Sequence, residues 1–117
     1  IENEESAVDR ARQNAEKNGL SGKARFIQRD LYHSDEGINA IDCDKLLLDP
    51  PRLGAEVALR GWVGKSVRQI AYISCNPRTF ARDADWLLKL GFECESICIF
   101  DMFPHTSHIE MLGNFRR

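Results

Sequence analysis

The chain of 117 residues is 43% hydrophobic and 29% charged, which is ordinary for a soluble globular protein of one domain. It contains no run of about 18 apolar residues, which excludes a membrane-spanning helix, and its net charge of −2 gives no overall basic footprint for nucleic acid. Its four cysteines form no Cys-x-x-Cys pair, which disfavours zinc and iron–sulfur sites and favours reduced thiols in the cytoplasm.

The first part of the chain predicts the end of a strand, a helix and a short strand. Glu2 closes the first strand, and Ser6 is expected to cap a helix that ends at Gly19. Residues 24–28 are expected to form a short strand, and Asp30 follows directly at its carboxyl end. Glu2 and Asp30 therefore occupy equivalent places, each at the end of a strand.

The middle of the chain contains an apolar strand that ends abruptly. After a polar, irregular stretch over residues 33–43, residues 45–48 are expected to form this strand. The sequence Asp-Pro-Pro-Arg at residues 49–52 ends it, because proline cannot continue a central ladder, and a helix is expected over about residues 55–65. The proline loop suits the binding of a planar acceptor, and an ordinary turn capped by Asp49 is the alternative.

A single cysteine lies where the next strand gives way to a helix. Residues 70–73 are β-branched or aromatic, as in a buried strand, and Pro77 is a good first residue for the helix that follows. The Cys75 thiol therefore lies at the positive end of the helix dipole, which favours the thiolate form. Such a place suits a nucleophile, and a cysteine that merely packs is the alternative.

The last part of the chain predicts a helix that closes at Gly91 and two further strands. These strands are expected over residues 92–101 and 108–115, and the connection between them is too short for a crossover, so they are expected to be antiparallel. Glu110, on a strand beside the cysteine, is a candidate general base. His105 and His108 lie nearby without a clear third ligand, so no metal site is expected.

The alternation of strands and helices predicts an α/β sheet with helices on both faces. Ligands of such sheets bind beyond the carboxyl ends of the strands, where Glu2, Asp30, Asp49 and Cys75 all fall. An acidic residue in the position of Glu2 commonly accepts from a pair of ribose hydroxyls. Asp30 is placed to accept from an adenine amino group or a neighbouring amide. Helix capping or solvation is the alternative for both.

Three motifs, in this order, resemble those of the RNA uracil-5-methyltransferase family. They are Asp-Pro-Pro-Arg at residues 49–52, Ser-Cys-Asn-Pro at residues 74–77 with Thr79, Arg82 and Asp83, and Phe-Asp-Met-Phe-Pro-His-Thr-x-His-x-Glu at residues 100–110. The Asp-Met-Phe-Pro-His-Thr stretch is more similar to the 23S rRNA enzymes than to the tRNA enzyme. The resemblance covers essentially the whole chain.

The resemblance implies a Rossmann-like, S-adenosyl-L-methionine-dependent methyltransferase fold. Its sheet would be mostly parallel and would end in a C-terminal antiparallel hairpin whose last strand lies between its two predecessors. The implied reaction is C5-methylation of a flipped-out uridine in 23S rRNA. Cys75 matches the family's nucleophile, which adds to C6, and Glu110 matches its base. Glu2, Asp30 and Asp49 match positions that contact the cofactor.

The resemblance also implies that residues 1–117 are the C-terminal part of one catalytic domain. The family's glycine-containing cofactor loop and RNA-binding module, and the iron–sulfur segment of some members, would precede Ile1. We therefore expect the isolated chain to bind the cofactor weakly, to turn over little or not at all, and to self-associate through its incomplete sheet.

Two other functions are consistent with parts of the sequence. A methyltransferase acting on amino groups uses an Asp/Asn-Pro-Pro-aromatic loop and needs no thiol, whereas this chain has Arg52 in the aromatic position and carries Cys75. A non-catalytic RNA-binding or assembly domain would bind RNA independently of Cys75 and Glu110.

Overall fold

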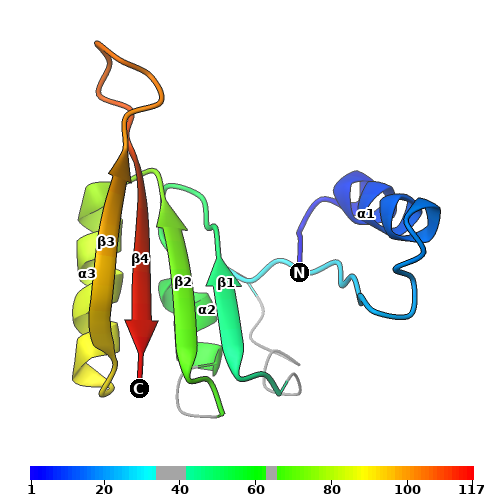
Figure 1. Cartoon of the computed structure of the whole chain (residues 1–117), viewed down its shortest axis with the longest axis horizontal. Helices are drawn as coiled ribbons and strands as arrows, with labels where there is room; N and C mark the ends of the chain where they lie inside the picture. Colours follow the sequence, from blue (N-terminus) through cyan, green and yellow to red (C-terminus); the bar gives the residue numbers. More distant parts are fainter. Residues whose placement is uncertain (34–41, 63–65) are drawn as a thin grey trace. The chain divides into compact units, whose positions relative to one another are not determined.

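The computed structural model describes residues 1–33, 42–62 and 66–117 (Figure 1). The chain divides into two compact units, Ile1–Glu36 and Gly37–Arg117, which are described separately. Most of the polar stretch expected over residues 33–43, and the end of the helix expected over residues 55–65, lie outside the described residues.

The first unit consists of one helix and an extended segment. Helix α1 spans Glu5–Lys17, and its N-cap is Glu4, so the predicted cap at Ser6 is wrong. Residues 24–28 do not form the expected strand, because within the described ranges their only bridge is a single parallel one from Glu2 to Gln28. One bridge leaves the remaining backbone groups of this segment outside any ladder, so it does not extend into a strand.

The second unit is built on a mixed sheet of four strands. They are β1 (Lys45–Leu48), β2 (Gln69–Ser74), β3 (Glu93–Phe100) and β4 (Glu110–Arg116). Their order in the sheet is β1-β2-β4-β3, with β1 and β2 parallel and β4 antiparallel to both of its neighbours. The predicted C-terminal hairpin is therefore present, and its last strand lies between its two predecessors.

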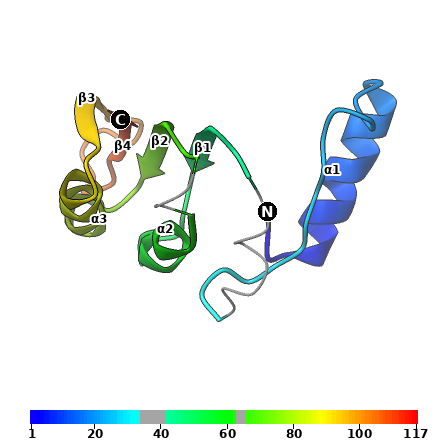
Figure 2. The same ribbon diagram turned by 90° about the horizontal axis from the view of Figure 1, so that it is seen from below.

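Two helices, α2 (Glu56–Trp62) and α3 (Pro77–Lys89), lie on the same face of this sheet (Figure 2). The expectation of helices on both faces is thus not met within the second unit. The alternating strand residues that point toward these helices are buried, whereas β3 is exposed along its whole length and carries an irregularity between Cys94 and Ser96.

An aromatic cluster joins α3 to the sheet. The Phe80 ring stacks on Tyr72 with centroids 5.4 Å apart and packs at 6.2 Å from Phe115. At Gly113 on β4, an added Cβ would come within 2.6 Å of the Phe80 ring, so only glycine leaves room for this packing. The cluster fixes the start of α3, and with it the Cys75 turn, against the middle of the sheet.

None of the helices in the described ranges is both long enough and apolar enough to cross a membrane.

Candidate active site

Two of the predicted site residues lie at one edge of the second unit's sheet, namely the edge formed by the carboxyl ends of its parallel strands. Asp49 is the first residue after β1, and Cys75 is the first residue after β2. Because β1 and β2 are parallel, their carboxyl ends meet at the same edge. The structure therefore brings the Asp49 loop and the Cys75 turn together, as expected from the strand order.

The ladder between β2 and β4 brings Glu110 to the same place. The last pair of this ladder is Ser74 with Met111, and both Cys75 and Glu110 lie one residue beyond it. Side chains directly opposite each other on antiparallel strands have Cβ atoms about 5 Å apart. Cys75 and Glu110 are both half-buried.

Hydrogen bonds of the two residues that flank Cys75, Ser74 and Asn76, hold the turn that carries it. The Asn76 backbone N–H donates to Ser74 Oγ at 3.1 Å, and the Ser74 hydroxyl donates to the Asn76 carbonyl at 3.1 Å. The Asn76 side chain also caps α3 by accepting from the backbone N–H of Arg78, and Pro77 is the first helical residue, as predicted. The thiol is therefore mounted on a fixed turn at the helix N-terminus.

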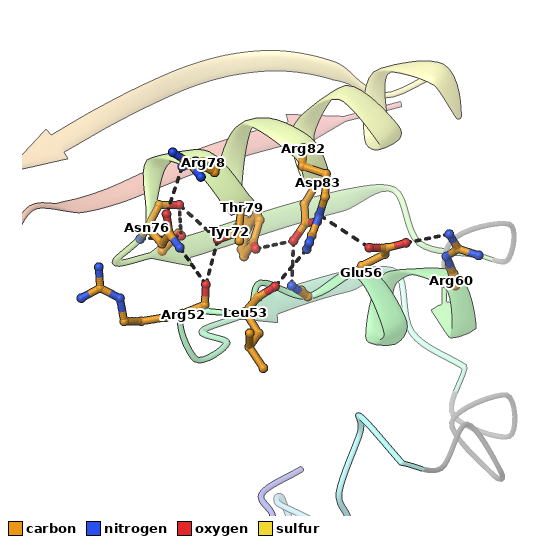
Figure 3. A network of polar contacts seen from close by, with 12 residues as sticks. Arg52, Leu53, Glu56, Arg60, Tyr72, Asn76, Arg78, Thr79, Arg82 and Asp83 are labelled. Carbon is orange, nitrogen blue, oxygen red and sulfur yellow. Dashed lines mark hydrogen bonds and ion pairs between the residues drawn. The ribbon is translucent and has the colours of Figure 1, made fainter.

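The proline loop after β1 lies against the first turns of α3, as Figure 3 shows. The Asn76 amide donates to the Arg52 carbonyl at 2.9 Å, so the loop and the cysteine turn are directly bonded. Beneath this contact the Tyr72 hydroxyl donates to the buried Asp83 carboxylate at 2.7 Å, and neither this bond nor the burial of Asp83 was predicted from the sequence. The only signal for them was the place of Asp83 in the second motif.

Glu2 and Asp30 lie in the first unit, where the bridge to Gln28 brings their backbones close together. Glu2 Oε1 accepts from the Glu4 backbone N–H at 2.9 Å. Asp30 accepts from the Tyr32 backbone N–H at 2.8 Å, and its second oxygen lies 2.6 Å from His33 Nδ1. Both carboxylates are thus held by local turns at the ends of extended segments.

The His33 hydrogen bond and then the Tyr32 backbone N–H lower the pKa of Asp30 below the ordinary aspartate value. Because the ionised form is favoured in the folded chain, the stabilisation from these bonds is present above the ordinary pKa and is lost as the pH falls through the lowered pKa.

We expect His33→Ala to raise the Asp30 pKa toward its ordinary value, measured by NMR titration of the carboxyl carbon. His105→Ala is the matched control, and equal Asp30 midpoints in wild type and His33→Ala would contradict the assignment.

The predicted turn between the last two strands is exposed and carries both remaining histidines. His105 has a φ of 68°, and His108 packs edge-to-face against Phe103 with ring centroids 6.4 Å apart. Within the described ranges, no three His, Cys, Asp or Glu side chains are grouped so that they could hold a metal ion. The two histidines shape the turn in this structure.

Two of the hollows on the described surface of the second unit are lined by neither Cys75 nor Glu110. One of about 520 Å³ lies on the sheet and is lined by residues of all four strands, and one of about 140 Å³ lies between α2 and α3.

Comparison with known proteins gives consistent matches over nearly the whole chain. The sequence model of the tRNA (uracil-5-)-methyltransferase family matches residues 2–115. The 23S rRNA (uracil(1939)-C(5))-methyltransferase RlmD of Histophilus somni is 42% identical over 94% of this chain and 25% of its own length. The RlmD of Xylella fastidiosa strain Temecula1 is 42% identical over 100% of this chain and 27% of its own length.

Solved structures show the same fold. The crystal structure of Pyrococcus abyssi tRNA (uracil-54, C5)-methyltransferase in complex with S-adenosyl-L-homocysteine has a TM-score of 0.76 and 30% identity, covering 98% of this chain and 28% of that one. The delta-N METTL16 MTase domain, at 14% identity and a TM-score of 0.57, covers 97% of this chain and 59% of its own and shares the fold alone. The chain spans about a quarter of the length of the curated relatives it matches.

Proposed function

The chain belongs to the tRNA (uracil-5-)-methyltransferase family, and from this membership we propose that the whole protein methylates C5 of a uridine in RNA. The observation that carries the proposal is the register of the ladder between β2 and β4, whose last pair, Ser74 with Met111, lies one residue before Cys75 and one residue after Glu110. A nucleophile and a base so placed can act on C6 and C5, which are bonded neighbours in the uracil ring.

Cys75 starts the proposed reaction. Uracil C5 is a poor nucleophile, and addition of the Cys75 thiolate to C6 forms a carbon–sulfur bond and moves the electron pair of the 5,6 double bond toward C5. C5 then forms its new bond to the methyl group as the bond between that group and the sulfonium sulfur breaks, and S-adenosyl-L-homocysteine leaves. The fixed turn between Ser74 and Asn76 holds the thiol in place for this addition.

Glu110 completes the reaction. After methylation, C5 carries both a hydrogen and the new methyl group, and the Glu110 carboxylate removes the C5 proton. The electron pair of that C–H bond restores the 5,6 double bond and expels the Cys75 thiolate. The base must lie beside the nucleophile for this elimination, which is the arrangement that the ladder favours.

Three carboxylates fit the cofactor of this reaction. S-adenosyl-L-methionine supplies a methyl group bound to a sulfonium cation, together with ribose hydroxyls and an adenine amino group that donate hydrogen bonds. Glu2 and Asp30, held at the ends of neighbouring extended segments, suit the ribose hydroxyls and the adenine amino group. Asp49 is exposed after β1 and suits the cationic part of the cofactor.

We propose RNA, and 23S rRNA in particular, as the substrate, which places the protein in the cytoplasm. The support is the 42% identity to relatives named as 23S rRNA methyltransferases. The target uridine must leave its base stack to reach an open edge of the sheet. Arg52 and Arg78 are exposed at this edge, and among the described residues neither pairs with a carboxylate, so both are available to RNA phosphates.

The substrate is tested by incubating the whole protein with S-adenosyl-L-methionine and either a 23S rRNA fragment or a tRNA transcript. Nucleoside mass spectrometry then measures 5-methyluridine. We expect the product from the rRNA fragment, and little or none from the isolated 117-residue chain. Methylation of the tRNA alone would contradict the rRNA assignment, and methylation of neither RNA would contradict the proposed activity.

We also propose that the isolated chain self-associates. Among the described residues strand β1 pairs only with β2, and Leu47 on this edge strand is 69% exposed. We expect light scattering to show a dimer or larger species that Leu47→Lys shifts toward monomer, with Leu88→Lys on exposed α3 surface as the control. A chain that stays monomeric as its concentration is raised would contradict this.

A further inference from the structure

One face of α3 carries a row of side chains that bind the backbone of the proline loop (Figure 3). The Asn76 amide and the Thr79 hydroxyl both donate to the Arg52 carbonyl, at 2.9 and 3.2 Å. The Arg82 guanidinium donates to the Leu53 carbonyl at 3.0 Å. The three donors are spaced three residues apart, so they follow one side of the helix and its cap.

A buried carboxylate fixes the far end of this contact. The Asp83 side chain is 0% exposed and accepts from the Ala55 backbone N–H and from the Tyr72 hydroxyl, both at 2.7 Å. It also pairs with Arg82 at 2.7 Å, and this partner raises the pKa of Arg82. Burial and the Asp83 hydrogen bond raise the pKa of Tyr72, so its hydroxyl remains a donor.

The loop approaches the helix closely enough to require a glycine. Gly54 has a φ of +87°, and a Cβ at this position would lie 2.6 Å from both Arg82 and Asp83 and 3.0 Å from Thr79. Any other residue would be strained in its backbone and would push the loop off the helix. These contacts hold the loop against α3, and we call them the loop–helix clamp and define it by Asn76, Thr79, Arg82 and Asp83.

The clamp joins the two segments that carry the proposed chemistry. Cys75 directly precedes Asn76, and Asp49 lies three residues before Arg52 on the clamped loop. We propose, resting on the function proposed above, that the clamp positions the Cys75 turn relative to the Asp49 loop. Thr79 is then a positioning residue, which acts through the Arg52 carbonyl without touching the substrate.

Among the four clamp residues, Thr79 is the one whose substitution can distinguish an effect on the position of the Cys75 turn from an effect on the stability of the fold. Its hydroxyl donates one hydrogen bond shared between the Arg52 and Asn76 carbonyls, both at 3.2 Å. Valine has nearly the same shape, so Thr79→Val removes the hydroxyl and retains the packing, whereas Thr79→Ser retains the hydroxyl. A displacement of reacting groups by about 1 Å can cost up to about 100-fold in rate.

The experiment compares Thr79→Val, Thr79→Ser and wild type in the whole protein, well below the unfolding temperature. Its readouts are kcat, KM for RNA, and the single-turnover rate of covalent adduct formation with RNA containing 5-fluorouridine. For Thr79→Val we expect a fall of about 10-fold in adduct formation and kcat with KM within about twofold, and we expect Thr79→Ser to retain the wild-type rate. Asp85→Asn, on the exposed side of the same helix, is the control.

A purely structural role predicts a different result. Thr79→Val would then lower the unfolding temperature but leave the adduct rate equal to that of Thr79→Ser. This outcome would contradict the positioning role of the clamp while leaving the proposed function intact. Absence of an adduct in wild type would instead overturn the proposed function, and the clamp's role with it. If Thr79→Val does not fold, Thr79→Ala removes the same hydroxyl with less bulk.

Discussion

Cys75→Ala in the whole protein is expected to abolish methylation of RNA. Without the thiolate, nothing adds to C6, and C5 keeps the weak nucleophilicity of free uracil, so the rate should fall by about 10⁴-fold or more. The measurement is transfer of a labelled methyl group from S-adenosyl-L-methionine to the rRNA fragment. Binding of the cofactor should be unchanged, because the change removes a group that acts on uracil.

Cys98→Ala is the matched control for this experiment. Cys98 is an exposed free thiol on β3, outside the edge that carries Cys75. We expect this variant to retain wild-type activity. Substantial methylation by Cys75→Ala would contradict the thiol mechanism and would favour a methyltransferase that needs no nucleophile of its own.

Glu110→Gln is expected to stop the reaction after methyl transfer. The amide has nearly the shape of the carboxylate but cannot accept the C5 proton, so the covalent complex between Cys75 and methylated RNA should accumulate. The turnover number should fall by about 10²- to 10⁴-fold, the usual contribution of a general base. Denaturing electrophoresis with unmodified RNA measures the accumulated complex directly.

Glu93→Gln is the control for the change at Glu110, because Glu93 is exposed at the opposite end of β3. It should turn over normally and accumulate no complex. A Glu110→Gln variant that loses activity without accumulating a complex would assign Glu110 a role before addition to C6 and would contradict its role as the base.

The sequence was most informative where local chemistry decides the structure. The strand over residues 45–48 appears with those bounds, and Pro77 begins α3 after an Asn76 cap. Family membership, predicted from three motifs, is confirmed by the match over residues 2–115. These features depend on apolar runs, capping residues and ordered motifs, all of which can be recognised without knowing the partner segments.

The sequence-based predictions are wrong where the local structure depends on a partner segment or on a neighbouring side chain. Residues 24–28 have strand composition but only one bridge partner, at Glu2, so no ladder forms in the described residues. Ser6 is a good cap by type, but the N-cap is Glu4 and the helix begins at Glu5, two residues earlier than a cap at Ser6 would place it. Both features depend on what lies beside the segment, which its own sequence does not encode.

The hydrogen bonds of the buried Asp83 could not be predicted from the sequence either, because they also depend on segments that are distant along the chain. An aspartate in the middle of a helix usually faces solvent, whereas Asp83 is fully buried because Tyr72 and the Ala55 backbone N–H both donate to it. These three groups come from a strand, a loop and a helix. Glu2 and Asp30 belong to the first unit, and Asp49, Cys75 and Glu110 belong to the second.

The most direct test of the proposed chemistry is mass spectrometry of the protein mixed with S-adenosyl-L-methionine and RNA carrying 5-fluorouridine. Fluorine at C5 cannot leave as a proton, so a reaction that begins with addition of Cys75 to C6 should stop as a covalent adduct. We expect peptide mapping to place this adduct on Cys75 in the whole protein. Absence of an adduct, under conditions where cofactor binding is measured, would contradict the role of Cys75 as the nucleophile.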